Sequence, residues 1–142
     1  MIFSHTVEYA IRAMTYLARQ PSGTLVGARE ISQAEEIPMP FLSKILQKLA
    51  RQKLVRSFKG LRGGYELARP ADQITLQTML AAVDGNPIEG RCVLGLKPCD
   101  EGSPCPLHTQ WGVIRNQVSA LLEQTTVGDL ARTSARLNRR PN

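Results

Sequence analysis

The sequence predicts a mainly α-helical fold, a winged helix-turn-helix with a small β-hairpin wing and a long C-terminal dimerisation helix. Three observations support this class. Two short helical patterns stand in tandem between residues 28 and 51, and the second has a basic outer face. A β-hairpin pattern follows at residues 54–67. Further along, residues 107–121 repeat apolar side chains at steps of four and three, as a heptad seam does.

Length and composition predict one domain with a substantial core. The chain has 142 residues, of which 42% are hydrophobic. No segment approaches the ~20 consecutive apolar residues that a transmembrane helix needs, and the N-terminus lacks a signal-peptide pattern. We therefore expect a cytoplasmic protein without a membrane partner.

The positive charge is concentrated in one part of the chain. The net charge is +6, and residues 44–69 hold eight Lys or Arg residues against the single acid Glu66. The rest of the chain carries ten basic and eleven acidic residues, so the whole excess belongs to this block. Concentrated positive charge favours a phosphate backbone as the partner, and a solvated charged face is the simpler alternative.

The first three helices follow from apolar spacing and from breaking residues. Ser4 can cap a first helix that ends at Pro21-Ser22-Gly23, and its apolar positions are Val7, Ala10, Ile11, Met14, Leu17 and Ala18. A second helix carries Ala28, Ile31 and Ala34 and ends at Ile37, before Pro38. A third begins at residues 38–40 and is predicted to direct inward Phe41, Leu42, Ile45, Leu46 and Leu49.

The opposite face of the third helix is polar and basic, which suits a recognition helix in a major groove. Its candidate DNA-binding residues are Pro40, Ser43, Lys44, Gln47, Lys48 and Arg51. Ser43 and Gln47, with Pro40 nearby, are candidate base readers. The lysines and Arg51 would mainly contact phosphates.

A basic hairpin is predicted after this helix. Residues 54–58 alternate like a strand, residues 59–64 form a glycine-rich turn, and residues 65–67 return as the partner strand. Lys59 and Arg62 lie at the tip, where they can reach the DNA backbone or minor groove. A nucleotide-binding phosphate loop is a weak alternative, because neither glycine-rich nucleotide motif is present.

The C-terminal half is predicted to contain three more helices. Thr75 can cap a fourth, with Leu76, Leu80 and Val83 inward, which ends at Asp84-Gly85-Asn86-Pro87. The heptad seam consists of Leu107, Trp111, Ile114, Val118 and Leu121. It predicts pairing with a second copy of the chain, and a helix packed on its own domain is the alternative. A short final helix starts near residues 126–130.

All three cysteines lie between the fourth and fifth helices, in the pattern C-x6-C-x5-C-x2-H from Cys92 through Cys99 and Cys105 to His108. In a reducing compartment, such a group favours a metal or redox site over structural disulfides. Prolines and glycines make this segment a loop that can close around a soft metal ion. Pro106 suits the first turn of a helix, which would place Cys105 and His108 on one face.

These motifs together resemble the iron-sulfur winged-helix regulators typified by IscR and NsrR. The resemblance rests on IPMPFLSKILQKL, GLRGGYELARP, the three cysteines before a long helix, and TTVGDLA, and it covers nearly the whole chain. It implies a homodimer that binds double-stranded DNA operators under the control of an iron-sulfur cluster. It also implies a winged-helix DNA-binding domain at 1–85, a cluster-binding loop at 86–106, and a dimerisation helix with a basic tail at 106–142.

By position, the resemblance implies that Cys92, Cys99 and Cys105 are thiolate ligands. His108 matches the fourth ligand of a 2Fe-2S cluster in IscR-type members, although the first cysteine gap is six residues here and five there. Glu8 matches the carboxylate that NsrR-type members supply to a 4Fe-4S cluster from the partner subunit. The shared helix face with Cys105 favours His108 and a 2Fe-2S cluster.

Other readings of the cysteines remain. Three cysteines and a histidine also suit a structural zinc site in a nucleic-acid-binding protein. A metal-free regulator could instead use two cysteines as a thiol switch. An enzyme is the least favoured reading, because no third group or substrate motif accompanies a Cys-His pair.

Overall fold

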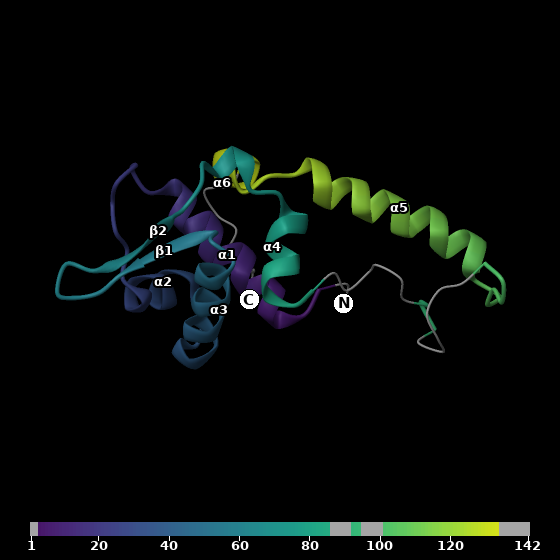
Figure 1. Ribbon diagram of the computed structural model, residues 1–142, viewed down its shortest axis with the longest axis horizontal. Helices are drawn as coiled ribbons and strands as arrows, with labels where there is room; N and C mark the ends of the chain where they lie inside the picture. Colours follow the sequence, from purple (N-terminus) through teal and green to yellow (C-terminus); the bar gives the residue numbers. More distant parts are fainter. Residues whose placement is uncertain (1–2, 86–91, 95–100, 134–142) are drawn as a thin grey trace.

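A computed structural model describes residues 3–85, 92–94 and 101–133 of the chain. Within these ranges the molecule is mainly helical, with one antiparallel hairpin (Figure 1). The elements are α1 (His5–Arg19), α2 (Ala28–Glu35), α3 (Met39–Arg51), β1 (Val55–Phe58), β2 (Gly64–Leu67), the 3-10 helix η1 (Ala71–Gln73), α4 (Leu76–Val83), α5 (His108–Gln124) and α6 (Val127–Thr133). The predicted fold class is confirmed.

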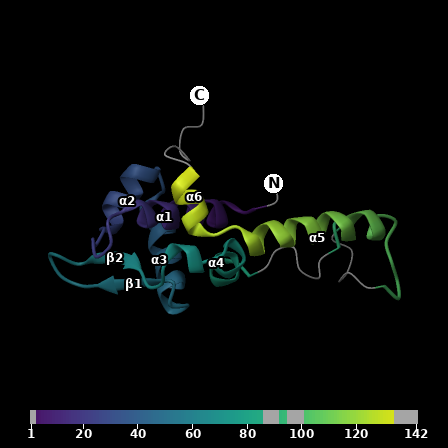
Figure 2. The ribbon, with the colours of Figure 1, turned by 90° about the horizontal axis from the view of Figure 1, so that it is seen from above.

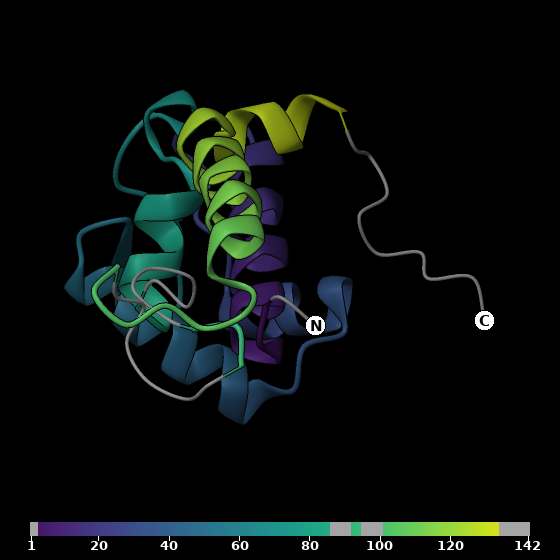
Figure 3. The same ribbon diagram turned by 90° about the vertical axis from the view of Figure 1, so that its right-hand side faces the viewer.

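Helix α1 lies at the centre of the core. Its N-cap is Ser4, as predicted, whose Oγ accepts a hydrogen bond from the Val7 N–H at 3.3 Å. Val7, Ala10 and Met14 are completely buried. Helices α2, α3, α4 and α6 all pack against α1. Figure 3, which looks along α5, shows α6 over one end of α1.

The helix-turn-helix forms where breaking residues predict it, but two side chains face unexpected directions. The chain turns at Glu36, which has a φ of 52°, and α3 begins at Met39. Phe41 is 54% exposed and lies at the rim of the core, with its ring 6.2 Å from that of Tyr9. On α2, Glu35 is buried and Ala34 is exposed. The reason is an ion pair across 3.9 Å that turns Glu35 toward Arg12 of α1.

The hairpin is joined to the rest of the domain at its base. Its register pairs Val55 with Leu67 and Phe58 with Gly64. The other edge of β2 exchanges two backbone hydrogen bonds with the loop before α2, from Val26 N–H to the Tyr65 carbonyl at 2.9 Å and back at 2.8 Å. These bonds fix the direction in which the wing projects from the helices (Figure 1).

Helix α4 is connected at its start to the end of α5. Thr75 caps it, as predicted, by accepting a hydrogen bond from the Thr78 N–H at 3.1 Å. The Leu76 N–H donates to the Thr125 carbonyl, and the Val127 N–H donates to the Ile74 carbonyl, both at 2.9 Å. The chain therefore returns to the winged helix after α5, and α6 packs on α1.

A reciprocal capping arrangement starts α6. The Asp129 N–H donates to Thr126 Oγ1 at 3.0 Å, and the Thr126 N–H donates to Asp129 Oδ2 at 2.9 Å. Hydrogen bonds from the backbone and then the side chain of Thr126 hold the pKa of the Asp129 carboxyl below its usual value. The final helix thus begins where the sequence predicts it.

Helix α5 extends away from the helical body, as Figure 2 shows from above. It begins at His108, so the expectation that Pro106 lies in its first turn, with Cys105 at its start, is wrong. Instead, the His108 N–H donates to the Cys105 carbonyl at 3.0 Å, which makes a separate turn before the helix. Only Leu122 of α5 is fully buried. None of the described helices is long and apolar enough to cross a membrane.

We predict that Gly64→Ala destabilises the domain by about 1–3 kcal/mol, because the added methyl group overpacks a tight contact. A Cβ at Gly64 would lie 2.8 Å from the carbonyl carbon and oxygen of Val26, and φ is +155°. Urea unfolding followed by circular dichroism would measure the change. The control is Gly112→Ala within α5, where a Cβ meets nothing within 4 Å. It should be neutral or stabilising by up to about 1 kcal/mol. Equal stability of the two variants would contradict the packing argument.

Candidate nucleic-acid interface and cysteine segment

The outer face of α3 presents several of the predicted DNA-binding residues together. Lys44, Gln47 and Arg51 are exposed, and they lie three and four residues apart on the same side of the helix. Pro40 is exposed in the first turn, whereas Ser43 is half-buried. The apolar face of α3, with Leu42, Ile45, Leu46 and Leu49, is buried in the core. Core packing therefore directs the polar face outward.

Lys48 differs from its neighbours on α3. Its Nζ donates a hydrogen bond to the Val83 carbonyl oxygen, at the end of α4, at 2.9 Å. Sequence reasoning placed this side chain with the phosphate contacts. The structure instead shows its ammonium group engaged within the protein, which only the packing of α3 on α4 could reveal.

The tip of the wing carries the other two predicted contacts. Lys59 and Arg62 are both exposed. A hydrogen bond from the Gly63 N–H to the Gly60 carbonyl at 3.0 Å closes the turn between them. Leu61, at this tip, is fully exposed. Sequence reasoning missed Leu61, although an apolar residue between two cations in a glycine-rich turn was a visible signal.

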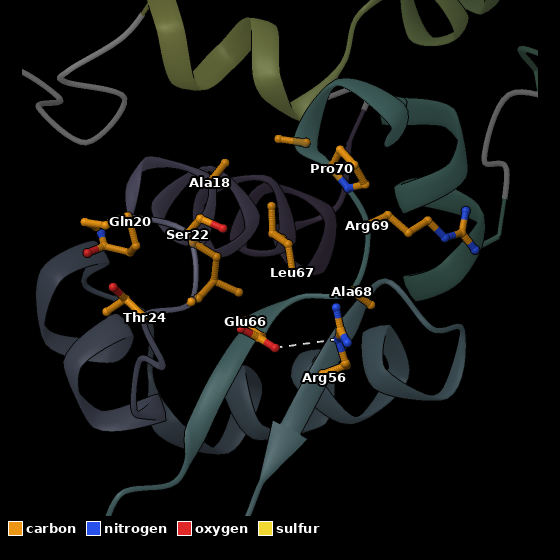
Figure 4. A pocket seen from close by; sticks show the side chains of 14 residues that line it. Ala18, Gln20, Ser22, Thr24, Arg56, Glu66, Leu67, Ala68, Arg69 and Pro70 are labelled. Carbon is orange, nitrogen blue, oxygen red and sulfur yellow. Dashed lines mark ion pairs between the residues drawn. The ribbon is translucent and has the colours of Figure 1, made fainter.

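The base of the wing borders a cavity of about 400 Å³ (Figure 4). Arg56 and Glu66 face each other there across the two strands, with Nε and Oε1 3.6 Å apart. The acid therefore offsets part of the basic block inside the hairpin. No cysteine or histidine is among the described residues that line this cavity, so it does not belong to the cysteine segment.

The structure places three of the four main candidate ligands and leaves one outside its range. Cys92 is buried with 8% of its surface exposed, and Cys105 is half-buried one turn before His108. Cys99 lies outside the described residues. In the part of the chain that the structure describes, no three metal-binding side chains are gathered. The donors nevertheless suit a soft metal, since thiolates and imidazole bind iron and zinc.

Glu8 stands in the first turn of α1, with its side chain 22% exposed. His5 Nδ1 lies 3.5 Å from Glu8 Oε2, an ion pair when the imidazole is protonated. Because Cys105 precedes α5, it does not share a helix face with His108, and that argument for the histidine no longer applies. The turn between Cys105 and His108 still makes them neighbours.

The predicted seam of α5 divides into two rows. Trp111 and Val118 pack against the core of the same chain. Leu107, Ile114 and Leu121 are 42%, 48% and 59% exposed, and they recur at intervals of seven residues. Both readings of the seam are therefore partly correct, because one row is used inside the chain and the other is open to a partner.

Comparison with known proteins is consistent with this architecture. The family model named Rrf2, described as iron-dependent transcriptional regulators, matches residues 3–133. A candidate HTH-type transcriptional regulator of Mycobacterium tuberculosis strain H37Rv is 39% identical over 132 residues, which are 92% of this chain and 81% of the relative. The regulator IscR of Vibrio parahaemolyticus is 33% identical over 123 residues, 87% of this chain and 73% of the relative.

The solved structure of CymR, the global cysteine regulator of B. subtilis, is similar across the whole fold. Its TM-score is 0.80 and its identity 26%, with 93% of this chain and 97% of that chain covered. The family match includes the helix-turn-helix, the wing and α5. The chain therefore belongs to the Rrf2 family and is a transcriptional regulator.

Proposed function

We propose that the chain binds a double-stranded DNA operator as a cytoplasmic homodimer, and that an iron-sulfur cluster controls this binding. The observation that carries DNA binding is the exposed row of Lys44, Gln47 and Arg51 on α3. Helix α3 packs against β1 of the wing, whose tip carries Lys59 and Arg62. Gln47 and Ser43 would read base edges from the major groove, and the cations would contact phosphates.

Cys92, Cys99 and Cys105 would hold the cluster through their thiolates, with His108 as the fourth ligand of a 2Fe-2S form. Glu8 is the alternative fourth ligand, in a 4Fe-4S form. The support comes from the donor types, the family description as iron-dependent regulators, and the similarity to IscR. Such a cluster supplies reversible one-electron chemistry and reactivity toward oxidants. The role of this chain is to bind it and to present the DNA-binding surface accordingly.

The exposed row on α5 supports the homodimer. Leu107, Ile114 and Leu121 would pack against the same row of a second copy. Pairing along α5 would also fix the spacing of two α3 helices on DNA, as a palindromic operator requires.

A metal-free thiol regulator is the second candidate. It is favoured by the similarity to CymR, which is named a cysteine regulator, and by the separation of the described ligands. Zinc is a further occupant that the same donors suit. The cluster is preferred because Cys92, Cys99, Cys105 and His108 together make a complete ligand set for iron.

We expect Lys59→Ala and Arg62→Ala each to weaken DNA binding and to flatten its salt dependence. Each lost phosphate contact should reduce the slope of log K against log salt by about 0.9. Fluorescence anisotropy would measure this with a duplex that the wild-type protein selects from a random pool. Arg115→Ala on α5 is the control for charge and should leave the slope unchanged. An unchanged slope in both wing variants would remove the wing from the interface.

We expect protein purified without oxygen to be brown, with visible charge-transfer absorption that Cys92→Ser and Cys105→Ser abolish. His108→Ala should shorten retention of the cluster, whereas Glu8→Gln and the control His5→Ala should not. Metal analysis and visible spectra measure both effects. The reverse pattern would assign the fourth ligand to Glu8. Colourless wild-type protein with stoichiometric zinc, or without metal, would instead support the zinc or the thiol reading.

We expect Ile114→Glu to convert the dimer to a monomer of 15.7 kDa at micromolar concentration. Losing two symmetry-related apolar contacts should raise the dimer dissociation constant by about 100-fold or more. Light scattering after size-exclusion chromatography would measure the mass. The matched control is Gln117→Glu, which adds the same charge at another exposed position of α5. A dimer that survives Ile114→Glu would exclude this row as the interface.

A further inference from the structure

The end of α4 is a junction between the recognition helix and the cysteine segment. Val83 is the last residue of α4, and Asp84 and Gly85 are the last described residues before Cys92. At this point Lys48 Nζ, from the middle of α3, donates to the Val83 carbonyl oxygen at 2.9 Å. A residue of α3 is thus bonded directly to the point where the chain leaves the winged helix toward the cysteines.

Electrostatics explain why a lysine occupies this place. The carbonyl end of a helix carries partial negative charge, and α4 has no basic residue in its last turn. Asp84, its C-cap, adds a carboxylate at the same end. Lys48 supplies the missing cation from a different helix, and its bond to Val83 is charge-assisted and partly buried. The ammonium group is therefore better satisfied inside the protein than in solvent.

A second contact joins the same junction to α1. Ser4 Oγ donates to Asp84 Oδ2 at 2.9 Å while accepting from the Val7 N–H at 3.3 Å. The start of α1, which also carries Glu8, is thereby connected to the end of α4. Helices α3 and α1 thus both contact the chain immediately before the cysteine segment.

The opposite end of α4 is held by the backbone bonds between residues 74–76 and 125–127. With its start pinned in this way, a displacement of the chain beyond Asp84 acts mainly on the end that Lys48 holds. Because α3 packs on α4, the displacement would reach α3 through the Lys48 bond. Coupling of this kind requires two arrangements that the cysteine segment stabilises unequally.

We propose that Lys48 is a positioning residue, which couples the state of the cysteine segment to the orientation of α3 and does not contact DNA phosphate. This inference rests on the proposed control by the cysteine ligands. It separates Lys48 from Lys44, which lies one turn earlier on the same helix with an exposed side chain. The two lysines of α3 then have different tasks, with Lys44 in the DNA interface and Lys48 in regulation.

The test compares Lys48→Met with the matched control Lys44→Met. Methionine keeps the length and the helix propensity of lysine and removes its charge and donors. For each protein, the affinity for the selected duplex is measured at several salt concentrations, metal-free and after anaerobic cluster loading. Thermal unfolding of the metal-free forms verifies that both variants are folded.

We expect Lys44→Met to reduce the salt slope by about 0.9 and to keep the wild-type ratio of loaded to metal-free affinity. Lys48→Met should keep the salt slope of the metal-free protein. It should also bring the affinity ratio at least about fivefold closer to one, since allosteric coupling typically amounts to about 5- to 150-fold.

Three results would overturn the inference, and they can be told apart. A wild-type ratio of one would remove the proposed cluster control and the coupling with it. A clear wild-type ratio that survives in Lys48→Met would remove the coupling alone. A fall in salt slope as large as that of Lys44→Met would show that Lys48 contacts phosphate. A variant that loses only thermal stability, with both DNA readouts unchanged, would likewise show a purely structural bond.

Discussion

Burial of α1 is the constraint on which the rest of the structure depends. Val7, Ala10, Ala13 and Met14 have no exposed surface, and four other helices cover them. Completely burying a side chain as large as methionine stabilises a protein by about 1.5–3 kcal/mol, so this stripe supplies a large share of the driving force. Because α2, α3, α4 and α6 must each present an apolar face to α1, their polar faces point outward. The recognition surface is thus a consequence of how the core is packed.

The basic block of the chain is divided by this packing. Lys44, Arg51, Lys59 and Arg62 remain exposed, whereas Arg56 is paired with Glu66 and Lys48 with the Val83 carbonyl. Net charge along a segment therefore overstates the number of groups that a phosphate backbone can meet. The internal bonds also have a use, since they join the wing to itself and α3 to α4. Charge contributes both to binding DNA and to holding the binding elements in position.

Helix α5 satisfies two demands with one repeat. Trp111 and Val118 anchor it on the winged helix, and the exposed row of Leu107, Ile114 and Leu121 is available to a second copy. The turn from Cys105 to His108 immediately precedes it. A change at the cysteine ligands would thus act on the beginning of the proposed dimer helix, while the junction at Val83 lies on the other side of the cysteine segment. The segment is placed between the elements that would set dimer geometry and the element that would read DNA.

Local sequence determined the helices, their Ser4 and Thr75 caps, the hairpin and the family, because apolar periodicity, capping and turn formation act over only a few residues. The outward Phe41, the buried Glu35, the start of α5 at His108 and the bond from Lys48 to Val83 were decided by the tertiary structure. Ser4 and Asp84, which are hydrogen-bonded, stand 80 positions apart. No local pattern specifies such partners, since each depends on which helix faces are brought together when the core closes around α1.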